Sequence, residues 1–334
     1  MEPLIGKHIL ELNNLLGDTS LSEKLARWIY RKRISDLNNI NDIPKRILHK
    51  ITSEYELGIY GPKEILIAKD GSFKHLFQNE QGKVFESVLM KTEKRNTLCV
   101  SSQSGCRMGC KFCMTGSIGF NGNLSSHDIL NQLLSIPNSN DINRIVVMGM
   151  GEPLDNYTEV YKAIQILTAD WGCAFGKTNI TLSSVGIIDE LKKFLDTPVC
   201  NLAISLHTPF HEERSDLMPI EKSNTIEEVV NLIRNIPLPK PLRVSFEYVA
   251  LSGVNVSSKH ALAIEELLKG IPCHLNIIPW NSHENAKFKT PKDEELQLFI
   301  DQLNSLGVLT SVRQSMANEI GAACGQMAGK VKNN

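Results

Sequence analysis

The chain has 334 residues, of which 42% are hydrophobic and 22% charged, and its formal net charge is −1 at pH 7. This balance is typical of a globular protein with one large domain, or a large and a smaller one; it excludes a disordered chain, and eight cysteines are too sparse for a disulfide scaffold. No apolar run approaches the roughly 20 residues that span a bilayer, and the start MEPLIGKHILELNN lacks the pattern of a signal peptide, so we expect a cytoplasmic protein.

Residues 4–56 are predicted to form helices. Apolar side chains recur at helical spacing in residues 10–16 and again in residues 25–29. Gly17–Ser20 interrupts this pattern, and Ser22 is the predicted N-cap of the second helix.

The same region carries a local excess of positive charge. Between Ser22 and Lys50, eight basic residues stand against three acidic ones. The basic residues are Lys24, Arg27, Arg31, Lys32, Arg33, Lys45, Arg46 and Lys50. Two interpretations stay open: a solvated helix face, or an accessory domain whose side chains contact phosphates. The neutral total charge permits both, because a local patch can be hidden in it.

Residues 64–90 change to short alternating stretches with turn signals at Asp70-Gly71 and Gln81-Gly82, which predicts a small β-hairpin region. After Asn96 the pattern becomes strand, then helix, repeatedly. The predicted strands are 97–101, 144–148, 179–183, 201–206, 243–250, 274–278 and 308–313. The predicted helices between them include 129–136, 160–167 and 226–233, and the predicted surface loops are 236–241 and 282–293.

This alternation predicts an α/β fold with a parallel sheet closed or half-closed into a barrel. The loops that follow the strands then meet at one rim, where function is expected.

Three cysteines, Cys106, Cys110 and Cys113, lie at the spacing C-x3-C-x2-C directly after the first predicted barrel strand. Three clustered thiolates can bind three irons of a four-iron, four-sulfur cluster and leave one iron open. Structural zinc is the alternative; it needs a fourth ligand, which His127 could supply from a distance. The remaining cysteines form no second pair: Cys99, Cys173, Cys200, Cys273 and Cys324.

Small polar groups follow the next strands. The run MGMGEPL, residues 148–154, offers glycines for close backbone approach and the Glu152 carboxylate for an amine. Similar positions are Ser183, the run Ser205-Leu206-His207, and Asn281. A lone His207 would be interpreted as a hydrogen-bonded core histidine, but several such sites on successive strand ends favour a shared ligand.

The cysteine motif resembles that of the radical S-adenosylmethionine (SAM) superfamily. Together with TLCVSSQSGC, MGMGEPL, IIPWN and AACGQ, it makes the chain similar to the RlmN/Cfr family of radical-SAM RNA adenine methyltransferases over nearly its full length. The resemblance implies a partial (β/α)6 barrel with an N-terminal helical accessory domain and a small β extension. It also implies a 4Fe-4S cluster on Cys106, Cys110 and Cys113.

SAM is the second cofactor that the resemblance implies. Gly151 and Glu152 would hold its amino group. Its ribose and adenine would contact Ser183, Ser205, Leu206, His207 and Asn281.

The resemblance further implies roles for two lone thiols. Carbon 2 of adenine is not nucleophilic and cannot displace the methyl group of SAM. Cys324 would therefore take a methyl group from one SAM, and a second SAM would give the radical that activates it. Cys99 would resolve the protein–RNA adduct by proton removal and a Cys99–Cys324 disulfide. Glu86, in FESVLM, matches a family glutamate near the target base, which implies an acid/base or base-positioning role; the alternative is an exposed strand carboxylate.

The family has two branches. One methylates carbon 2 of adenosine in 23S rRNA and tRNA; the other methylates carbon 8 in 23S rRNA and confers antibiotic resistance. Pro153 and Pro279-Trp280-Asn281 resemble the first branch, which we favour, and Arg313-Gln314-Ser315 resembles the second. Gly321 stands where the family usually has an aspartate, which bears on how the Cys324 loop is held.

A zinc-stabilised RNA-binding protein and a radical-SAM enzyme for a small molecule are the alternatives from other classes. Neither needs the Cys99 and Cys324 pair. The expected partners are 23S rRNA, tRNA and an electron donor such as flavodoxin, and the expected state is a monomer. The predicted domains are 1–58 (helical accessory, RNA-binding), 59–95 (β extension), 96–316 (barrel) and 317–334 (segment with the methyl-carrier cysteine).

Overall fold

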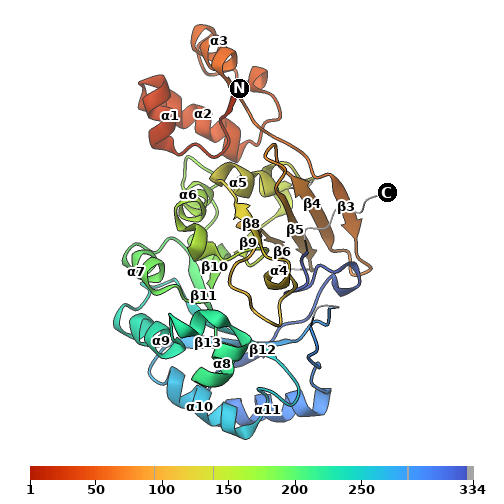
Figure 1. Cartoon of the computed structure of the whole chain (residues 1–334). Helices are drawn as coiled ribbons and strands as arrows, with labels where there is room; N and C mark the ends of the chain where they lie inside the picture. The colour runs from red at the N-terminus through yellow and green to blue at the C-terminus, as the bar shows by residue number, and fades with distance from the viewer. Residues whose placement is uncertain (94, 138, 284–285, 329–334) are drawn as a thin grey trace.

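A computed structural model describes residues 1–93, 95–137, 139–283 and 286–328. Within these residues, a ten-stranded sheet runs in the order β14-β13-β12-β11-β10-β9-β6-β5-β4-β3 (Figure 1). From β6 to β14 all neighbouring strands pair in parallel. These strands are β6 (Asn96–Cys99), β9 (Arg144–Val147), β10 (Ile180–Ser184), β11 (Asn201–Ser205), β12 (Val244–Ala250), β13 (Cys273–Pro279) and β14 (Thr310–Val312). The predicted α/β partial barrel is confirmed.

Helices alternate with the parallel strands (Figure 1), and most of them cover the outer face of the sheet, whereas the short first helix follows the cysteine loop beside the strand ends. They are α4 (Met114–Ser117), α5 (Ser126–Leu134), α6 (Tyr157–Thr168), α7 (Ile188–Asp196), α8 (His211–Leu217), α9 (Ile226–Asn235), α10 (Ser258–Leu268) and α11 (Asp293–Ser305). Helix α9 shows why they form: Thr225 and Glu228 make a capping box, and apolar residues at helical spacing face the core. Asp293 begins α11, so the predicted surface loop at 282–293 ends one residue earlier.

The β extension continues the barrel sheet. Strands β3 (Glu64–Ile67), β4 (Phe73–Gln78) and β5 (Val84–Lys91) form an antiparallel meander, and β5 pairs with β6. In this register Val88 lies opposite Cys99. The extension therefore places its side chains beside the first barrel strand and the rim that follows it.

The N-terminal region forms α1 (Ile9–Leu16), α2 (Thr19–Ala26), α3 (Lys45–Glu54) and the short parallel pair β1 (Glu2–Pro3) and β2 (Tyr55–Glu56). One prediction here is wrong, because Asp18 and not Ser22 caps α2. The Asp18 carboxylate accepts a hydrogen bond from Leu21 N at 2.9 Å. Ser22 is buried inside the helix and donates to the Asp18 carbonyl at 2.7 Å. The negative charge of Asp18 at the N-terminus of α2 also interacts favourably with the helix dipole.

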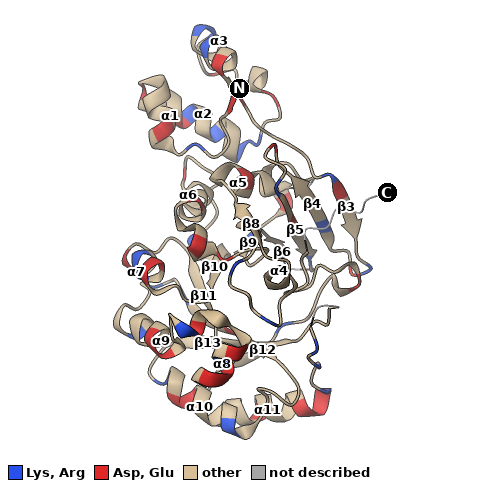
Figure 2. Cartoon of the chain, viewed as in Figure 1, with Lys and Arg blue, Asp and Glu red and all other residues tan. Residues whose placement is uncertain are grey.

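Part of the basic N-terminal segment holds these helices to the barrel. Arg31 donates to the Asp170 carbonyl at 3.4 Å, and Arg33 donates to the Ser139 carbonyl. In contrast, Lys45, Arg46 and Lys50 are exposed and belong to α3, which lies at one end of the molecule and is drawn partly blue (Figure 2). None of the helices in the described residues is long and apolar enough to cross a membrane.

Candidate active site

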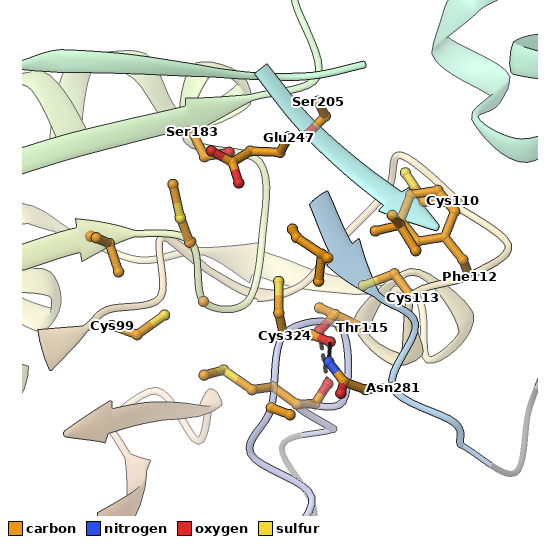
Figure 3. Close-up of a pocket in the computed structure, with 18 of the residues that line it drawn as sticks. Cys99, Cys110, Phe112, Cys113, Thr115, Ser183, Ser205, Glu247, Asn281 and Cys324 are labelled. Carbon is orange, nitrogen blue, oxygen red and sulfur yellow. Dashed lines mark hydrogen bonds between the residues drawn. The ribbon is translucent and has the colours of Figure 1, made fainter. Parts of the chain in front are cut away.

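The carboxyl ends of the parallel strands surround a cavity of about 230 Å³ (Figure 3). The predicted site residues that line it are Cys99, Cys106, Cys110, Cys113, Gly151, Glu152, Ser183, Ser205, His207, Asn281 and Cys324. They come from five different strand ends, the cysteine loop and the C-terminal segment. The fold therefore gathers nearly all of the predicted site in one place, with Glu86 and Leu206 as the exceptions.

The three clustered cysteines lie on one wall of this cavity, in the loop before α4. Burial raises the pKa of Cys106 to about 12 and raises that of Cys110 well above its ordinary value, and neighbouring thiols add to both shifts. Such thiols are neutral at pH 7 unless a cation compensates their charge, which bound iron does. Among the described residues, no group of three or more His, Cys, Asp or Glu side chains converges on a single ion. A four-iron cluster does not require that, because each cysteine binds a different iron atom.

Glu152 is held rigidly at the rim. Its carboxylate accepts hydrogen bonds from Leu154 N and Val185 N, both at 3.0 Å. Burial nevertheless raises its pKa to about 7. A nearby ammonium group stabilises the ionised form of such a buried carboxylate, so Glu152 suits the amino group of SAM.

Gly151 allows this arrangement. Its φ is +100°, and an added Cβ would lie 2.5 Å from Gln103 Cβ. Gln103 Oε1 in turn accepts a hydrogen bond from Glu152 N at 2.9 Å. Close packing between the first two strand ends therefore requires a residue without a side chain at this position.

His207 lines the cavity as a neutral ring. Its Nδ1 accepts a hydrogen bond from Val249 N at 3.0 Å, and burial lowers its pKa to about 3. Nε2 is therefore the ring's donor. The ring also meets Phe112 edge-on at 4.6 Å. Leu206 is fully buried in the core and does not line the cavity, although its backbone N–H bonds to Glu247 O at 2.9 Å.

Cys324 lies between Cys99 and Cys113 in the cavity (Figure 3). Its side chain has accessible surface within the cavity, but protein surrounds it and raises its pKa to about 11. Burial raises the pKa of Cys99 to about 12. All eight cysteines are free thiols, so the Cys99–Cys324 disulfide that the resemblance implied is absent from the folded structure.

The segment around Cys324 is seated by backbone contacts. Asn281 Nδ2 donates to the Cys324 carbonyl at 3.1 Å (Figure 3). Met114 N donates to the Gly325 carbonyl at 2.7 Å, and Thr115 Oγ1 donates to the Met327 carbonyl at 2.7 Å. The C-terminal segment is thus bound both to the loop after β13 and to the helix that follows the cysteine loop.

Glu86 is buried on β5 and does not line the cavity. It forms an ion pair with Lys74 at 3.0 Å. It shares a face of β5 with Val88 and Met90, which do line the cavity, because alternate residues of a strand point the same way. The exposed strand carboxylate considered from the sequence is therefore not what the structure shows, and a role near the target base stays a prediction.

Sequence reasoning missed Glu247 of the cavity and used Arg313 only as a marker of the second branch. Glu247 lies on β12, and Arg313 Nε lies 3.2 Å from its Oε2. Asn276 also donates to Glu247 Oε1 at 2.8 Å. The available signal was a glutamate inside the apolar strand VSFEYVA, since a buried charge needs a partner.

His127, the candidate fourth zinc ligand, lies elsewhere. It is on α5 and lines a second cavity, beside the N-terminal helices. Its Nε2 lies 2.5 Å from the Gly58 carbonyl oxygen. The structure therefore does not bring this histidine to the three cysteines.

Comparisons with known proteins agree with this geometry. The family model of the radical SAM superfamily matches residues 100–263. A radical SAM methyltransferase from Sphaerobacter thermophilus has a similar structure, with a TM-score of 0.91, 32% sequence identity, and coverage of 99% of this chain and 100% of that chain. The fold and the cysteine-lined cavity therefore define a radical-SAM enzyme, which uses a 4Fe-4S cluster and SAM.

Two relatives define the family. A probable dual-specificity RNA methyltransferase RlmN from Parabacteroides distasonis is 42% identical over 332 residues, or 97% of this chain and 96% of that protein. A protein of the same name from Clostridium botulinum is 37% identical over 310 residues, or 92% of this chain and 89% of that protein. The chain belongs to the RlmN family of radical-SAM RNA methyltransferases.

Proposed function

We propose that this enzyme methylates carbon 2 of adenosine in 23S rRNA and tRNA, with Cys324 as the carrier of the methyl group. The observation that supports this most is the position of Cys324, between Cys113 and Cys99 in one cavity (Figure 3). A second thiol beside the radical cofactors has no use in simple SAM cleavage. It is needed where the methyl group must be activated after transfer to the protein.

Cys106, Cys110 and Cys113 would hold the cluster, and the Glu152 carboxylate would receive the amino group of SAM. When bound, the cluster and SAM supply the 5′-deoxyadenosyl radical. Ser183, Ser205, His207 and Asn281 line the same cavity and would orient the nucleoside part of SAM. We keep Leu206 only as a backbone support for this set.

Cys324 acts first as a nucleophile. Its thiol proton leaves to solvent, and the thiolate forms a bond to the methyl carbon while the bond between that carbon and the SAM sulfur breaks. S-adenosylhomocysteine is released with the electron pair of the broken bond. Arg313 favours this step, because its guanidinium acts against burial and lowers the pKa of Cys324.

Cys99 would first give its thiol proton to solvent and then, as a thiolate, remove a proton from the adduct between Cys324 and the base. Burial keeps this thiol protonated in the resting protein, and Cys324 itself adds to the upward shift of its pKa. Once Cys324 carries a methyl group it no longer ionises, and this repulsion is gone. We assign Glu86 to positioning of the base from the adjoining face of β5.

RNA would be bound by the helical accessory region, 1–58, with the exposed basic side chains of α3 contacting phosphates. The other proposed units are the β extension, 59–95, the barrel, 96–316, and the carrier segment, 317–334, of which 329–334 lie outside the described residues. We propose that the enzyme is a cytoplasmic monomer that receives electrons from a donor such as flavodoxin.

Carbon-8 methylation is the second candidate, since Arg313-Gln314-Ser315 resembles that branch and lines the cavity. The names of the relatives favour carbon 2.

Mass spectrometry of rRNA and tRNA nucleosides from cells with and without the gene tests the proposal. The deletion is complemented with wild type, Cys324→Ala or Cys273→Ala, a matched control because Cys273 lies outside the cavity. We expect 2-methyladenosine to disappear in the deletion and with Cys324→Ala, and to return with the other two proteins. A response of 8-methyladenosine would select the second candidate, and no response of either nucleoside would refute RNA methylation through Cys324.

A further inference from the structure

The turn between β3 and β4, with the start of β4, forms hydrogen bonds to the segment that leads to Cys324. Residues 69–74 contact residues 317–321, nearly 250 positions away in the chain. Three hydrogen bonds join them: Ala317 N donates to Asp70 Oδ2 at 2.7 Å, Lys69 N donates to Glu319 Oε1 at 2.6 Å, and Lys74 Nζ donates to the Gly321 carbonyl at 3.1 Å. We call this set of contacts the hairpin latch.

Lys74 differs from the other members because it makes two contacts at once. Its ammonium group donates to the Gly321 carbonyl and lies 3.0 Å from Glu86 Oε1. Both charged side chains are withdrawn from solvent, with 11% of Lys74 and 1% of Glu86 exposed. Because little solvent reaches the Lys74–Glu86 ion pair, its electrostatic attraction is only weakly screened and both side chains are held in place. Lys74 therefore ties the C-terminal segment to the carboxylate on β5.

The link between Gly321 and Cys324 is short and stiff. Only Ala322 and Ala323 lie between them, and these are 5% and 3% exposed. Three residues of chain span at most about 11 Å, so holding the Gly321 carbonyl limits where the thiol can be.

Gly321 itself is suited to this contact. Its φ is +61°, and an added Cβ would meet no atom within 4 Å. The anchor here is its backbone carbonyl, which every residue type has. A side chain at this position is therefore not required to hold the Cys324 loop, although the family usually has an aspartate there.

We propose that Lys74 is a positioning residue for methyl transfer, which holds the Cys324 loop closed over the cavity and in register with Glu86. This rests on the proposed function, in which Cys324 carries the methyl group. Lys74 does not touch the reacting atoms. Its effect reaches them through Gly321 on one side and Glu86 on the other.

The test measures how fast iodoacetamide alkylates Cys324 in the cluster-loaded enzyme, followed by peptide mass spectrometry. We expect Lys74→Met to raise this rate roughly tenfold or more, because loss of the contact with the Gly321 carbonyl releases the Cys324 segment and gives the reagent access to the thiol. Lys74→Arg, which keeps a cationic donor, should stay within about twofold of wild type. Lys69→Met is the matched control, because it removes an exposed neighbouring lysine and leaves the backbone contact of residue 69 intact.

A second readout separates positioning from mere stabilisation. With RNA substrate, Lys74→Met should lower kcat about tenfold and leave KM for RNA and the iron content unchanged. Should loss of the Lys74–Glu86 ion pair unfold Lys74→Met, the double variant Lys74→Met/Glu86→Gln removes both charges and is used for the alkylation assay.

Alkylation of Cys324 at the wild-type rate in folded Lys74→Met or in the double variant would overturn the proposal. This outcome is distinct from failure of the proposed function. If wild type forms no methyladenosine but Lys74→Met still accelerates alkylation, the latch stands and the proposed function falls. If wild type methylates RNA through Cys324 and Lys74→Met changes neither rate nor alkylation, only the latch falls.

Discussion

At the scale of single residues, the guanidinium of Arg313 lies in the same cavity as the thiols of Cys99 and Cys324. Burial raises the pKa of both Cys99 and Cys324, and Arg313 lowers both. Glu247 fixes this guanidinium at 3.2 Å. The ion pair therefore does more than satisfy a buried carboxylate: it places a fixed positive charge near each thiol.

Gly151 supports a quantitative prediction at this scale. Gly151→Ala should destabilise the protein by about 2–3 kcal/mol and abolish SAM binding, because the new Cβ would lie 2.5 Å from Gln103 Cβ and move the Glu152 backbone. Urea unfolding and titration of the cluster-loaded enzyme with SAM measure the two effects. Gly307→Ala is the control: its φ is +82° but nothing lies within 4 Å of an added Cβ, so we expect a loss of about 1 kcal/mol and normal SAM binding. Wild-type SAM affinity in Gly151→Ala would contradict this account.

At the scale of elements, strand β4 carries a buried histidine that makes stability depend on pH. Burial lowers the pKa of His75 to about 4, and its ring lies parallel to that of Phe73. In the unfolded chain His75 has a pKa near 6.5, so between about pH 6.5 and 4 it is protonated there but neutral in the folded protein. This contribution is therefore present above pH 6.5 and is lost as pH falls.

Between pH 7.5 and 5 we expect His75 to account for a loss of about 2 kcal/mol in the free energy of unfolding. His75→Phe fills the same space without a titrating group. In urea unfolding at both pH values, the variant should lose about that much less than wild type. Equal losses in the two proteins would mean that the histidine accepts a proton in the folded state.

Helix α3 gives a prediction about RNA. Replacing Lys45, Arg46 and Lys50 by Gln should weaken RNA binding uniformly across sequences. It should also reduce the slope of log affinity against log salt by about 2–3, because RNA binding releases fewer counterions when three phosphate contacts are missing. Filter binding at several salt concentrations measures this slope.

The matched control removes three exposed lysines from the barrel side, Lys192, Lys269 and Lys292. Its salt slope should equal that of wild type. An equal reduction in both triple variants would show that net charge, and not the α3 surface, sets the affinity.

At the scale of the whole molecule, the sequence predicts those features that depend on residues close together along the chain. The cysteine loop, Gly151 and Glu152 were found because their spacing along the chain carries the chemistry, and the strand–helix alternation predicted the parallel sheet. The N-cap of α2 was assigned to the wrong residue because Asp18, Ser20 and Ser22 all have capping side chains and only the fold selects one.

What the sequence could not show depends on contacts between distant segments. The pairing of Val88 with Cys99 joins the β extension to the barrel, and no local pattern encodes that partner. The Glu247–Arg313 pair and the Lys74–Gly321 contact likewise join elements that are far apart along the chain. The full site thus exists only once the sheet, the rim and the C-terminal segment are assembled.

The most direct test of the central claim follows the methyl group through Cys324. Enzyme whose Cys324 has been methylated with deuterium-labelled SAM is freed of that SAM, then given unlabelled SAM and RNA for a single turnover. We predict that the 2-methyladenosine formed carries deuterium, because its carbon comes from the protein. Unlabelled 2-methyladenosine in that turnover would show that the methyl group bypasses Cys324 and would contradict the account.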